Sequence, residues 1–386
     1  MIENYILKHK EIPVISFKLN TDSYEVEAIN KIFEAERLPF GYRNGKETSY
    51  INQLNKWIDH RGISESRKDY EDTLYVTNAG SAKDLSVYSL GLNLTDHYWL
   101  HSEKHDYKWR DLNFFDNEFN DLVLKRIYPS DKDNDTSNIH PDFSVDGSLI
   151  KKWVYDVKDR ILIKEGRSDN NQEPYNEAIA SKIMKILSID HVEYLLKTIN
   201  NRKVSVCKCM VNSDTEFITA SHIFDTQMNK NKNPYKQYIE ICKKNGLADI
   251  SGKLNEMIIM DFIMGNTDRH KRNFGIIRDA NSLEWLYAAP LFDNGNSLFF
   301  DSTIRGSTKD NIDSYCKWFR ESNYKKLEYI QYPEWYDFQK TKEVTDIIHA
   351  GLQKNKNISA EKIAKITRIA ENRVKELDKV MRKLHA

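Results

Sequence analysis

The chain has 386 residues and a formal net charge of zero, with 30% charged and 40% hydrophobic residues. Balanced charge disfavours bulk electrostatic binding to nucleic acid or membranes, and the composition is that of a globular chain, not a disordered one. Four cysteines are too few for a disulfide framework, the first residues resemble no signal peptide, and no stretch is long enough to span a membrane. We therefore expect a cytoplasmic protein of two or three packed units.

The first 128 residues are predicted to form an accessory unit. Residues 12–19 have the pattern of a strand, residues 26–35 and 51–58 that of helices, and residues 88–94 alternate as a strand would.

Residues 98–119 are crowded with aromatic side chains. A cluster of this density favours a core or inter-domain contact over a base-stacking or peptide-binding face. The members are Trp99, Tyr107, Trp109, Phe114, Phe115 and Phe119.

Three histidines, His97, His101 and His105, recur at every fourth position in the same region. On a helix they would share one face and could bind a metal. The local apolar pattern does not favour a helix, so we interpret the segment as an exposed loop. The polar, turn-forming run at residues 130–138 is the best candidate for a linker, which we place at 129–140.

After this linker the pattern becomes regular. Residues 151–155 and 160–164 are predicted to be strands, and a helix follows in which Pro174 suits the first turn. Two more strands are expected at residues 192–195 and 203–209.

Lys164 ends the second of these strands, and Glu177 lies early in the helix, off its apolar stripe. A lysine supplies a compact charge to phosphates, and a glutamate can hold its ammonium in place. The alternative is an exposed lysine and a solvated glutamate. Gly147 and Ser148 precede the first strand, where a phosphate-covering loop or a plain hairpin turn would fit. Residues 210–214 leave the sheet and are a candidate hinge contacting an adenine.

The strongest pattern begins where an apolar helix, residues 254–264 of a largely helical stretch at 216–265, ends at Gly265. Asp268 is followed five positions later by Asn273, and a predicted hairpin then leads to Asp293 in an Asp-Asn-Gly turn.

This layout suits phosphoryl transfer, because a carboxylate must meet the attacking hydroxyl and hard oxygen ligands must hold Mg²⁺ against phosphates. The plainer interpretation is a polar loop capped by Asp268, with Asp293 in an ordinary turn.

The remaining residues are predicted to pack around this centre. Residues 297–322 are polar and mixed, as expected of a mobile segment, and residues 344–352 form a helix. Ser359 is expected to cap a last long helix whose apolar stripe extends to Leu384. Packing of that helix onto the rest of the chain is favoured over a coiled-coil dimer, because the stripe is short.

Two motifs carry a resemblance to a known family. The run N-T-D-R-H-x-x-N-F-G at residues 266–275, followed by P-L-F-D-x-G-x-S-L at 290–298, closely resembles the signature of HipA-like serine/threonine kinases, which are related in fold to phosphatidylinositol kinases. The segments I-L-I-K at 161–164 and E-P-Y-N-E at 173–177 look like the family's lysine strand and glutamate helix. The likeness covers about residues 141–386.

The resemblance implies an α+β, two-lobed protein-kinase-like fold with a mixed N-lobe sheet (141–211), a helical C-lobe (212–386) and an extra N-terminal unit. It implies an ATP- and Mg²⁺-dependent protein kinase, with Asp268 on the acceptor hydroxyl and Asn273 and Asp293 on the metal. Lys164, positioned by Glu177, would hold the phosphates beneath the loop of Gly147 and Ser148.

In this family the enzyme is often the toxin of a bacterial toxin–antitoxin pair, so a small DNA-binding antitoxin is an expected partner and direct binding to nucleic acid is not. The family also has a phosphate-loop serine that becomes autophosphorylated, and Ser148 is the nearest match. Two alternatives stay open: a small-molecule or lipid kinase on the same scaffold, and a silent nucleotide-binding module.

Overall fold

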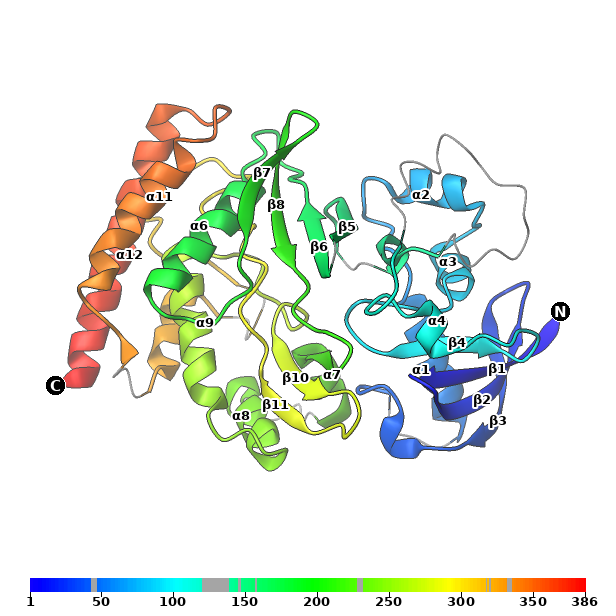
Figure 1. Ribbon diagram of the computed structural model, residues 1–386. Coiled ribbons are helices and arrows are strands. Elements are labelled where there is room, and N and C mark those ends of the chain that lie inside the picture. The colour runs from blue at the N-terminus through cyan, green and yellow to red at the C-terminus, as the bar shows by residue number, and fades with distance from the viewer. Residues whose placement is uncertain are drawn as a thin grey trace.

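The computed structural model divides into an N-terminal part, a central β-rich part and a helical part that contains the C-terminus (Figure 1). Each of its three sheets is antiparallel, so the predicted α+β class is confirmed. None of the described helices combines the length and apolar character needed to cross a membrane. The structure describes residues 1–42, 47–119, 139–144, 147–156, 158–227, 232–316, 318, 321–331 and 335–386.

The N-terminal part contains a four-stranded sheet of order β3-β2-β1-β4. The strands are β1 (Ile2–His9), β2 (Ile12–Asn20), β3 (Glu25–Ile32) and β4 (Tyr98–Ser102). The helix predicted at residues 26–35 is wrong, because this segment pairs with β2 as an edge strand. Pairing with a neighbouring strand outweighs the weak local preference of such a mixed polar sequence.

Among the described residues, this part also contains α1 (Glu47–Asp59), which packs against β3, together with α2 (Tyr70–Thr77), α3 (Ala82–Tyr88) and the short α4 (Trp109–Leu112). The helix predicted at 51–58 lies within α1. The strand predicted at 88–94 is wrong, because α3 ends there and the chain turns at Leu90 and Gly91 with φ of 54° and 62°. A Cβ on Gly91 would lie 2.8 Å from the ring of Trp57, so the turn requires glycine.

The aromatic cluster forms a contact between parts of the chain, as one of its two interpretations predicts. Trp99, Trp109 and Phe114 pack with Trp153 of the central sheet. Leu162 of that sheet and Cys209, which directly follows its last residue, pack against the same cluster. Of the linker predicted at residues 129–140, residues 129–138 lie outside the described ones, whereas His140 is buried and Ile139 packs against the aromatic cluster.

The predicted exposed loop is wrong for His97 and His101, while His105 lies in a bend after β4 and is half-buried. His97 is fully buried and contacts the carbonyl oxygen of Thr215 at 3.1 Å, and His101 lies in β4. Among the residues that the structure describes, no group of three or more His, Cys, Asp or Glu could hold a metal ion. The three histidines lie before, within and after β4, so no helical face brings them together.

The central sheet has the order β5-β6-β8-β7 and is antiparallel at every pairing, not mixed. Its elements are β5 (Lys151–Asp156), β6 (Asp159–Lys164), helix α6 (Glu173–Ile186), β7 (Leu195–Ile199) and β8 (Arg202–Lys208). The crossover through α6 makes β6 and β7 run in the same direction, but β8 lies between them. The strand expected at 192–195 begins later, at Leu195.

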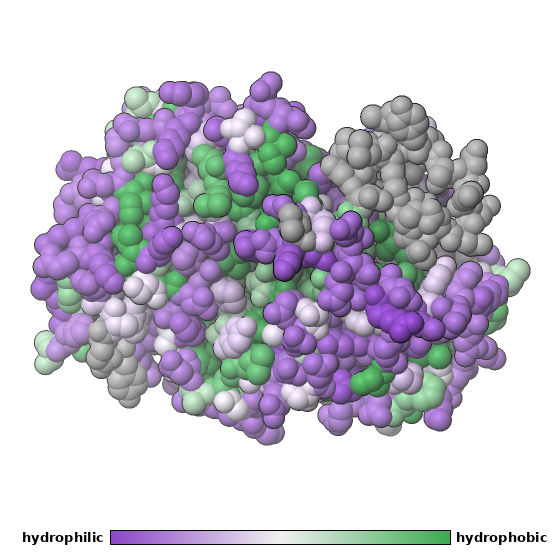
Figure 2. Space-filling view, in the orientation of Figure 1, coloured by the Kyte–Doolittle hydropathy of each residue, from purple (hydrophilic) through white to green (hydrophobic). Residues whose placement is uncertain are grey.

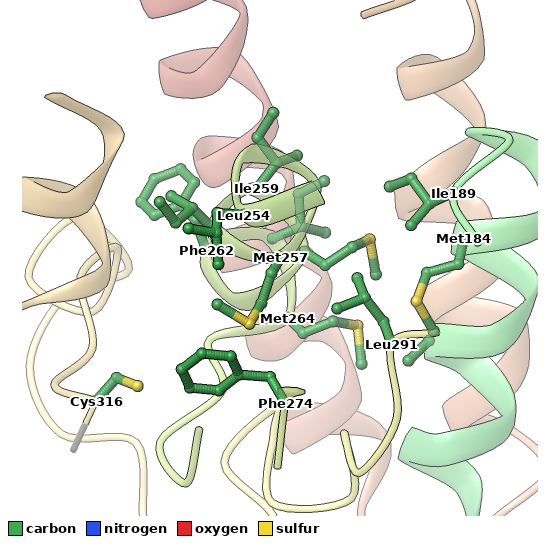
Figure 3. Packing of buried hydrophobic residues seen from close by; sticks show 14 of the residues in the cluster. Met184, Ile189, Leu254, Met257, Ile259, Phe262, Met264, Phe274, Leu291 and Cys316 are labelled. Atoms are coloured by element: carbon green, nitrogen blue, oxygen red, sulfur yellow. The ribbon is translucent and has the colours of Figure 1, made fainter. Parts of the chain in front are cut away.

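The helical part is built around α9 (Ile250–Met264), which is apolar on nearly all sides and therefore lies inside the core. Figure 3 shows Met257 and Met264 of this helix among the buried side chains, with Phe274 and Leu291 near them. The other helices are α7 (Ala220–Gln227), α8 (Pro234–Lys244), α10 (Asn323–Lys326), α11 (Val344–Leu352) and α12 (Ala360–His385).

The terminal helix α12 packs beside α11, as predicted (Figure 1). Ser359 caps it by accepting a hydrogen bond from the Lys362 amide. Leu384 was expected in its apolar stripe but is 45% exposed, because the helix extends past the surface on which it packs. Most of the surface in Figure 2 is hydrophilic, with hydrophobic residues recessed between polar ones.

A three-stranded sheet of order β11-β10-β9 supports the hairpin predicted before Asp293. It contains β9 (Thr215–Thr219), β10 (Gly275–Asp279) and β11 (Trp285–Ala288). The stretch at 216–265 was predicted to be largely helical, and its first residues instead form β9. This strand exists because it pairs with β10, about sixty residues later in the chain.

Gly275 is required by this pairing, and Gly275→Ala is expected to destabilise the protein by about 1–3 kcal/mol. A Cβ there would lie 2.0 Å from the carbonyl oxygen of Ile218, a backbone atom that cannot move without disturbing the sheet. Urea unfolding measures the loss. Gly80→Ala is the control, because its nearest neighbour would lie at an ordinary 3.8 Å. Equal stability of the two variants would contradict this reasoning.

A buried ionic cluster joins the N-terminal sheet to β9 and β10. Glu216 pairs with Arg278 and with His9, at 3.1 Å from the latter, and Arg278 also donates to the Tyr98 hydroxyl at 2.9 Å. Burial opposes ionisation of Glu216, but Arg278 and His9 outweigh it and lower its pKa to about 2. The N-terminal part is therefore held against the hairpin by charged as well as apolar contacts.

Candidate active site

Lys164 lies at the end of β6 with its ammonium buried between two carboxylates. Its Nζ is 2.5 Å from Oε1 of Glu177 and 2.6 Å from Oδ1 of Asp293. Lys164 is 3% exposed and Glu177 1%, so the alternative of an exposed lysine and a solvated glutamate is wrong. Three predicted site residues from three distant segments therefore meet in one contact.

Glu177 connects the lysine to the Asp-Asn-Gly turn. Its second oxygen, Oε2, accepts a hydrogen bond of 2.8 Å from the backbone N–H of Asn294. Glu177 of α6 therefore contacts both the end of β6 and the turn that follows the hairpin.

The electrostatics favour the charged forms of Lys164 and Asp293, whereas burial raises the pKa of the Glu177 carboxyl. Burial disfavours the Lys164 ammonium, but the adjacent Asp293 and Glu177 outweigh it and raise the lysine pKa well above its usual value. Burial likewise opposes ionisation of Asp293, while Lys164 and Lys151 hold its pKa well below the usual range. A cation and an anion are thus maintained side by side at neutral pH.

The loop of Asp268 begins where α9 ends. Gly265 takes a left-handed conformation, with φ of 59°, and its missing side chain leaves room for Arg373, whose Nη1 would lie 2.2 Å from a Cβ. The Asp268 N–H then donates to Oδ1 of Asn266 at 2.9 Å. Asn273 returns its amide N–H₂ to the Asp268 carbonyl at 3.2 Å, so the two predicted residues close one compact loop.

Arg269 ties this loop to the turn of Asp293. It is fully buried and pairs with Asp261 of α9 at 3.0 Å. It also donates to the Phe292 carbonyl at 2.6 Å and to Oδ1 of Asn294 at 2.8 Å. The guanidinium of Arg269 therefore joins the loop of Asp268 to the turn of Asp293.

Sequence reasoning missed Asp261 and Asn176. Asp261 interrupts the apolar run at residues 257–264 of α9, and that position is a usable signal, because a buried charge needs a partner. Asn176 precedes Glu177, is fully buried, and donates to the carbonyl oxygens of Gly295 and Ser297 at 2.9 and 2.7 Å. Asn176 therefore anchors the segment that follows Asp293. The backbone of Asp293 has a left-handed conformation, with φ of 59°.

Gly147 and Ser148 lie just before β5. Gly147 has φ of 104°, a conformation that favours glycine, and the Ser148 hydroxyl accepts a hydrogen bond of 2.9 Å from Arg167. Arg167 also donates its backbone N–H to Glu173, at the start of α6. Ser148 is thus placed near the end of β6 through Arg167, and the preceding residues 145–146 lie outside the described ones.

The segment at residues 297–322, predicted to be mobile, contains buried anchors. Four of its side chains are buried, those of Leu298, Phe300, Cys316 and Trp318. The backbone N–H of Trp318 donates a hydrogen bond to the backbone carbonyl of Arg269 at 3.0 Å. This segment therefore packs against the loop of Asp268. Residues 210–214 connect β8 to β9, and their contact with an adenine stays a prediction.

The donor set fits a nucleotide with Mg²⁺. Mg²⁺ prefers oxygen ligands and is held by one or two protein groups together with substrate phosphates. Asp293 supplies a partly exposed carboxylate of low pKa, and Asn273 supplies an amide on the adjoining loop. Lys164 supplies the cation suited to phosphate oxygens.

Comparisons with known proteins point to one group of enzymes. No family model matches the chain. It is 25% identical over 217 residues to the serine/threonine-protein kinase CtkA of Helicobacter pylori, a match that covers 50% of this chain and 62% of that protein.

Similar solved structures include the following two. One is the Helicobacter pylori proinflammatory kinase CtkA (16% identity, TM-score 0.48, 61% of this chain and 94% of that one). The other is HipA of Shewanella oneidensis MR-1, solved with HipB and operator DNA (9% identity, TM-score 0.52, 99% of both chains). The HipA comparison establishes the fold over the whole chain.

Proposed function

We propose that this chain, which is related to the HipA-like serine/threonine kinases and shares their fold, transfers a phosphoryl group from ATP to a protein hydroxyl. The observation that carries the proposal is the buried contact of Lys164 with Glu177 and Asp293, joined through Arg269 to the loop of Asp268. That arrangement supports the proposal, because a lysine, carboxylates and an amide whose chemistry suits phosphate, Mg²⁺ and an acceptor hydroxyl lie on neighbouring segments.

The nucleotide half of the site has three proposed parts. Lys164 binds the α- and β-phosphates, Glu177 holds its ammonium, and Asp293 with Asn273 holds Mg²⁺. When bound, the metal neutralises charge that develops on the transferring phosphate. Gly147 and Ser148 are proposed to cover the phosphates from the start of β5.

The acceptor half is proposed to depend on Asp268. Its carboxylate orients the acceptor hydroxyl and takes its proton as the bond to phosphorus forms. Arg269 is fully occupied by Asp261 and by backbone and amide oxygens, so it supports the loop and does not bind substrate.

The acceptor class is tested by supplying ATP labelled at its γ-phosphate to the protein with bacterial lysate. A protein kinase transfers the label to serine or threonine residues of proteins. Label that accumulates only in soluble metabolites or lipids would instead support the alternative kinases, and no transfer would support a silent nucleotide-binding module.

Nucleotide binding gives an independent prediction. ATP with Mg²⁺ is expected to raise the melting temperature, because a ligand that binds only the folded state stabilises it, by about 2.7 kcal/mol at a hundred times its Kd. ATP without Mg²⁺ should raise it less.

The control for this measurement is Asp293→Asn, which removes the proposed metal ligand's charge and should abolish the Mg²⁺-dependent part of the shift. A shift that is equal with and without metal in the wild-type protein would contradict the proposed nucleotide site.

We further propose a small DNA-binding antitoxin as a partner. The support is the likeness to HipA across 99% of both chains, the N-terminal part included. If the chain is such a toxin, its expression arrests bacterial growth and co-expression of the antitoxin relieves the arrest.

A further inference from the structure

Asn296 lies three residues after Asp293, at an unspecified position of the motif at 290–298. Its side-chain amide donates a hydrogen bond of 2.7 Å to Oδ2 of Asp268. The backbone carbonyl oxygen of Asn296 accepts two hydrogen bonds from Thr267. One comes from the backbone N–H at 3.1 Å and the other from the hydroxyl at 3.2 Å. Side chain and main chain of one residue therefore hold two consecutive residues of the catalytic loop.

The position of Asn296 is itself determined by α6. The residues on both sides of it, Gly295 and Ser297, have their carbonyl oxygens bound by the fully buried amide of Asn176. A Cβ on Gly295 would lie 3.3 Å from Cβ of Glu173, so the turn packs closely against the helix. The helix that carries Glu177 thus also sets where the Asn296 amide points.

We propose that Asn296 is a positioning residue for Asp268, an inference that rests on the proposed function. A hydrogen bond to one oxygen of a carboxylate fixes the plane of the group and the direction of its other oxygen. An amide does this without a positive charge, so Asp268 keeps its full negative charge for the acceptor hydroxyl. The contact also couples the acceptor half of the site to the nucleotide half through α6.

Two substitutions test this role through kinetics at several pH values. Asn296→Ala removes the donor and is expected to lower kcat about 10²-fold with little change in KM for ATP, because a misplaced group loses that order of rate. Asn296→Asp keeps the shape but sets a second carboxylate beside Asp268. Two adjacent carboxylates titrate as a pair with a raised apparent pKa, so the acid limb of the pH–rate profile should move up by about one unit or more.

Asn357→Asp is the matched control, because it adds the same charge at an exposed position in the turn between α11 and α12. It should leave kcat and the pH profile unchanged. Melting curves verify that each variant is folded, and the nearly isosteric Asn296→Asp provides the answer if Asn296→Ala does not fold.

Wild-type kcat in Asn296→Ala, or an unshifted acid limb in Asn296→Asp, would overturn the positioning role while the kinase function stands. A rise in KM for ATP with unchanged kcat would also overturn it, since it would place Asn296 on the nucleotide. Absence of transfer by the wild-type protein contradicts the proposed function, and this role with it.

Discussion

Asp268→Asn is expected to lower the rate of phosphoryl transfer about 10²–10⁴-fold, the usual contribution of a positioned general base, with little change in ATP affinity. The substitution keeps the shape of the side chain and an oxygen that can accept from the Asn296 amide, but it removes the charge. Binding should survive because the contacts of Lys164 with Glu177 and Asp293 do not involve Asp268.

The measurement pairs single-turnover transfer from labelled ATP with calorimetry of ATP binding. Asp22→Asn is the control, because this carboxylate lies in the turn between β2 and β3 and is 82% exposed. Loss of ATP binding together with activity would assign Asp268 to the metal or to the structure of the loop. If the chain is a toxin, growth arrest that persists in this variant would show that toxicity does not depend on phosphorylation.

Arg269→Gln is expected to destabilise the protein by about 3–5 kcal/mol, because it leaves the buried carboxylate of Asp261 without its counter-ion. It also removes the donors to Phe292 and Asn294 that join the loop of Asp268 to the turn of Asp293. Activity should therefore fall even under conditions where the variant remains folded.

Urea unfolding measures the loss, and the double variant Asp261→Asn/Arg269→Gln tests its cause. Removing both charges should recover part of the stability, since no uncompensated ion remains. Arg272→Gln, at an exposed position of the same loop, should change the free energy of unfolding by less than about 0.5 kcal/mol. An Arg269→Gln variant as stable as Arg272→Gln would show that the ion pair contributes little.

Two neighbouring residues of this loop have different environments. Asp268 faces the proposed acceptor and is partly exposed, whereas Arg269, its neighbour, points into the core. Adjacent residues on a loop can thus serve the chemistry and the fold separately, and the variants distinguish the two by rate and by stability.

The sequence by itself was sufficient for features that local chemistry decides. Pro174 in a first turn, Ser359 as a cap and Gly265 as a left-handed helix end each follow from the conformation that one residue prefers. Lys164 at a strand end and the five-residue spacing of Asp268 and Asn273 are equally local. The roles of these residues in transfer stay predictions.

The tertiary structure alone decided which distant groups meet. Strands β3 and β9 were misassigned because their sequences are weak on their own and are stabilised by pairing with β2 and β10. The partners of Arg269 and Asp268, namely Asp261 and Asn296, lie on other segments, and no spacing along the chain encodes their contacts. Burial makes these contacts necessary, because a charge or amide taken from water must find a partner wherever the fold brings one.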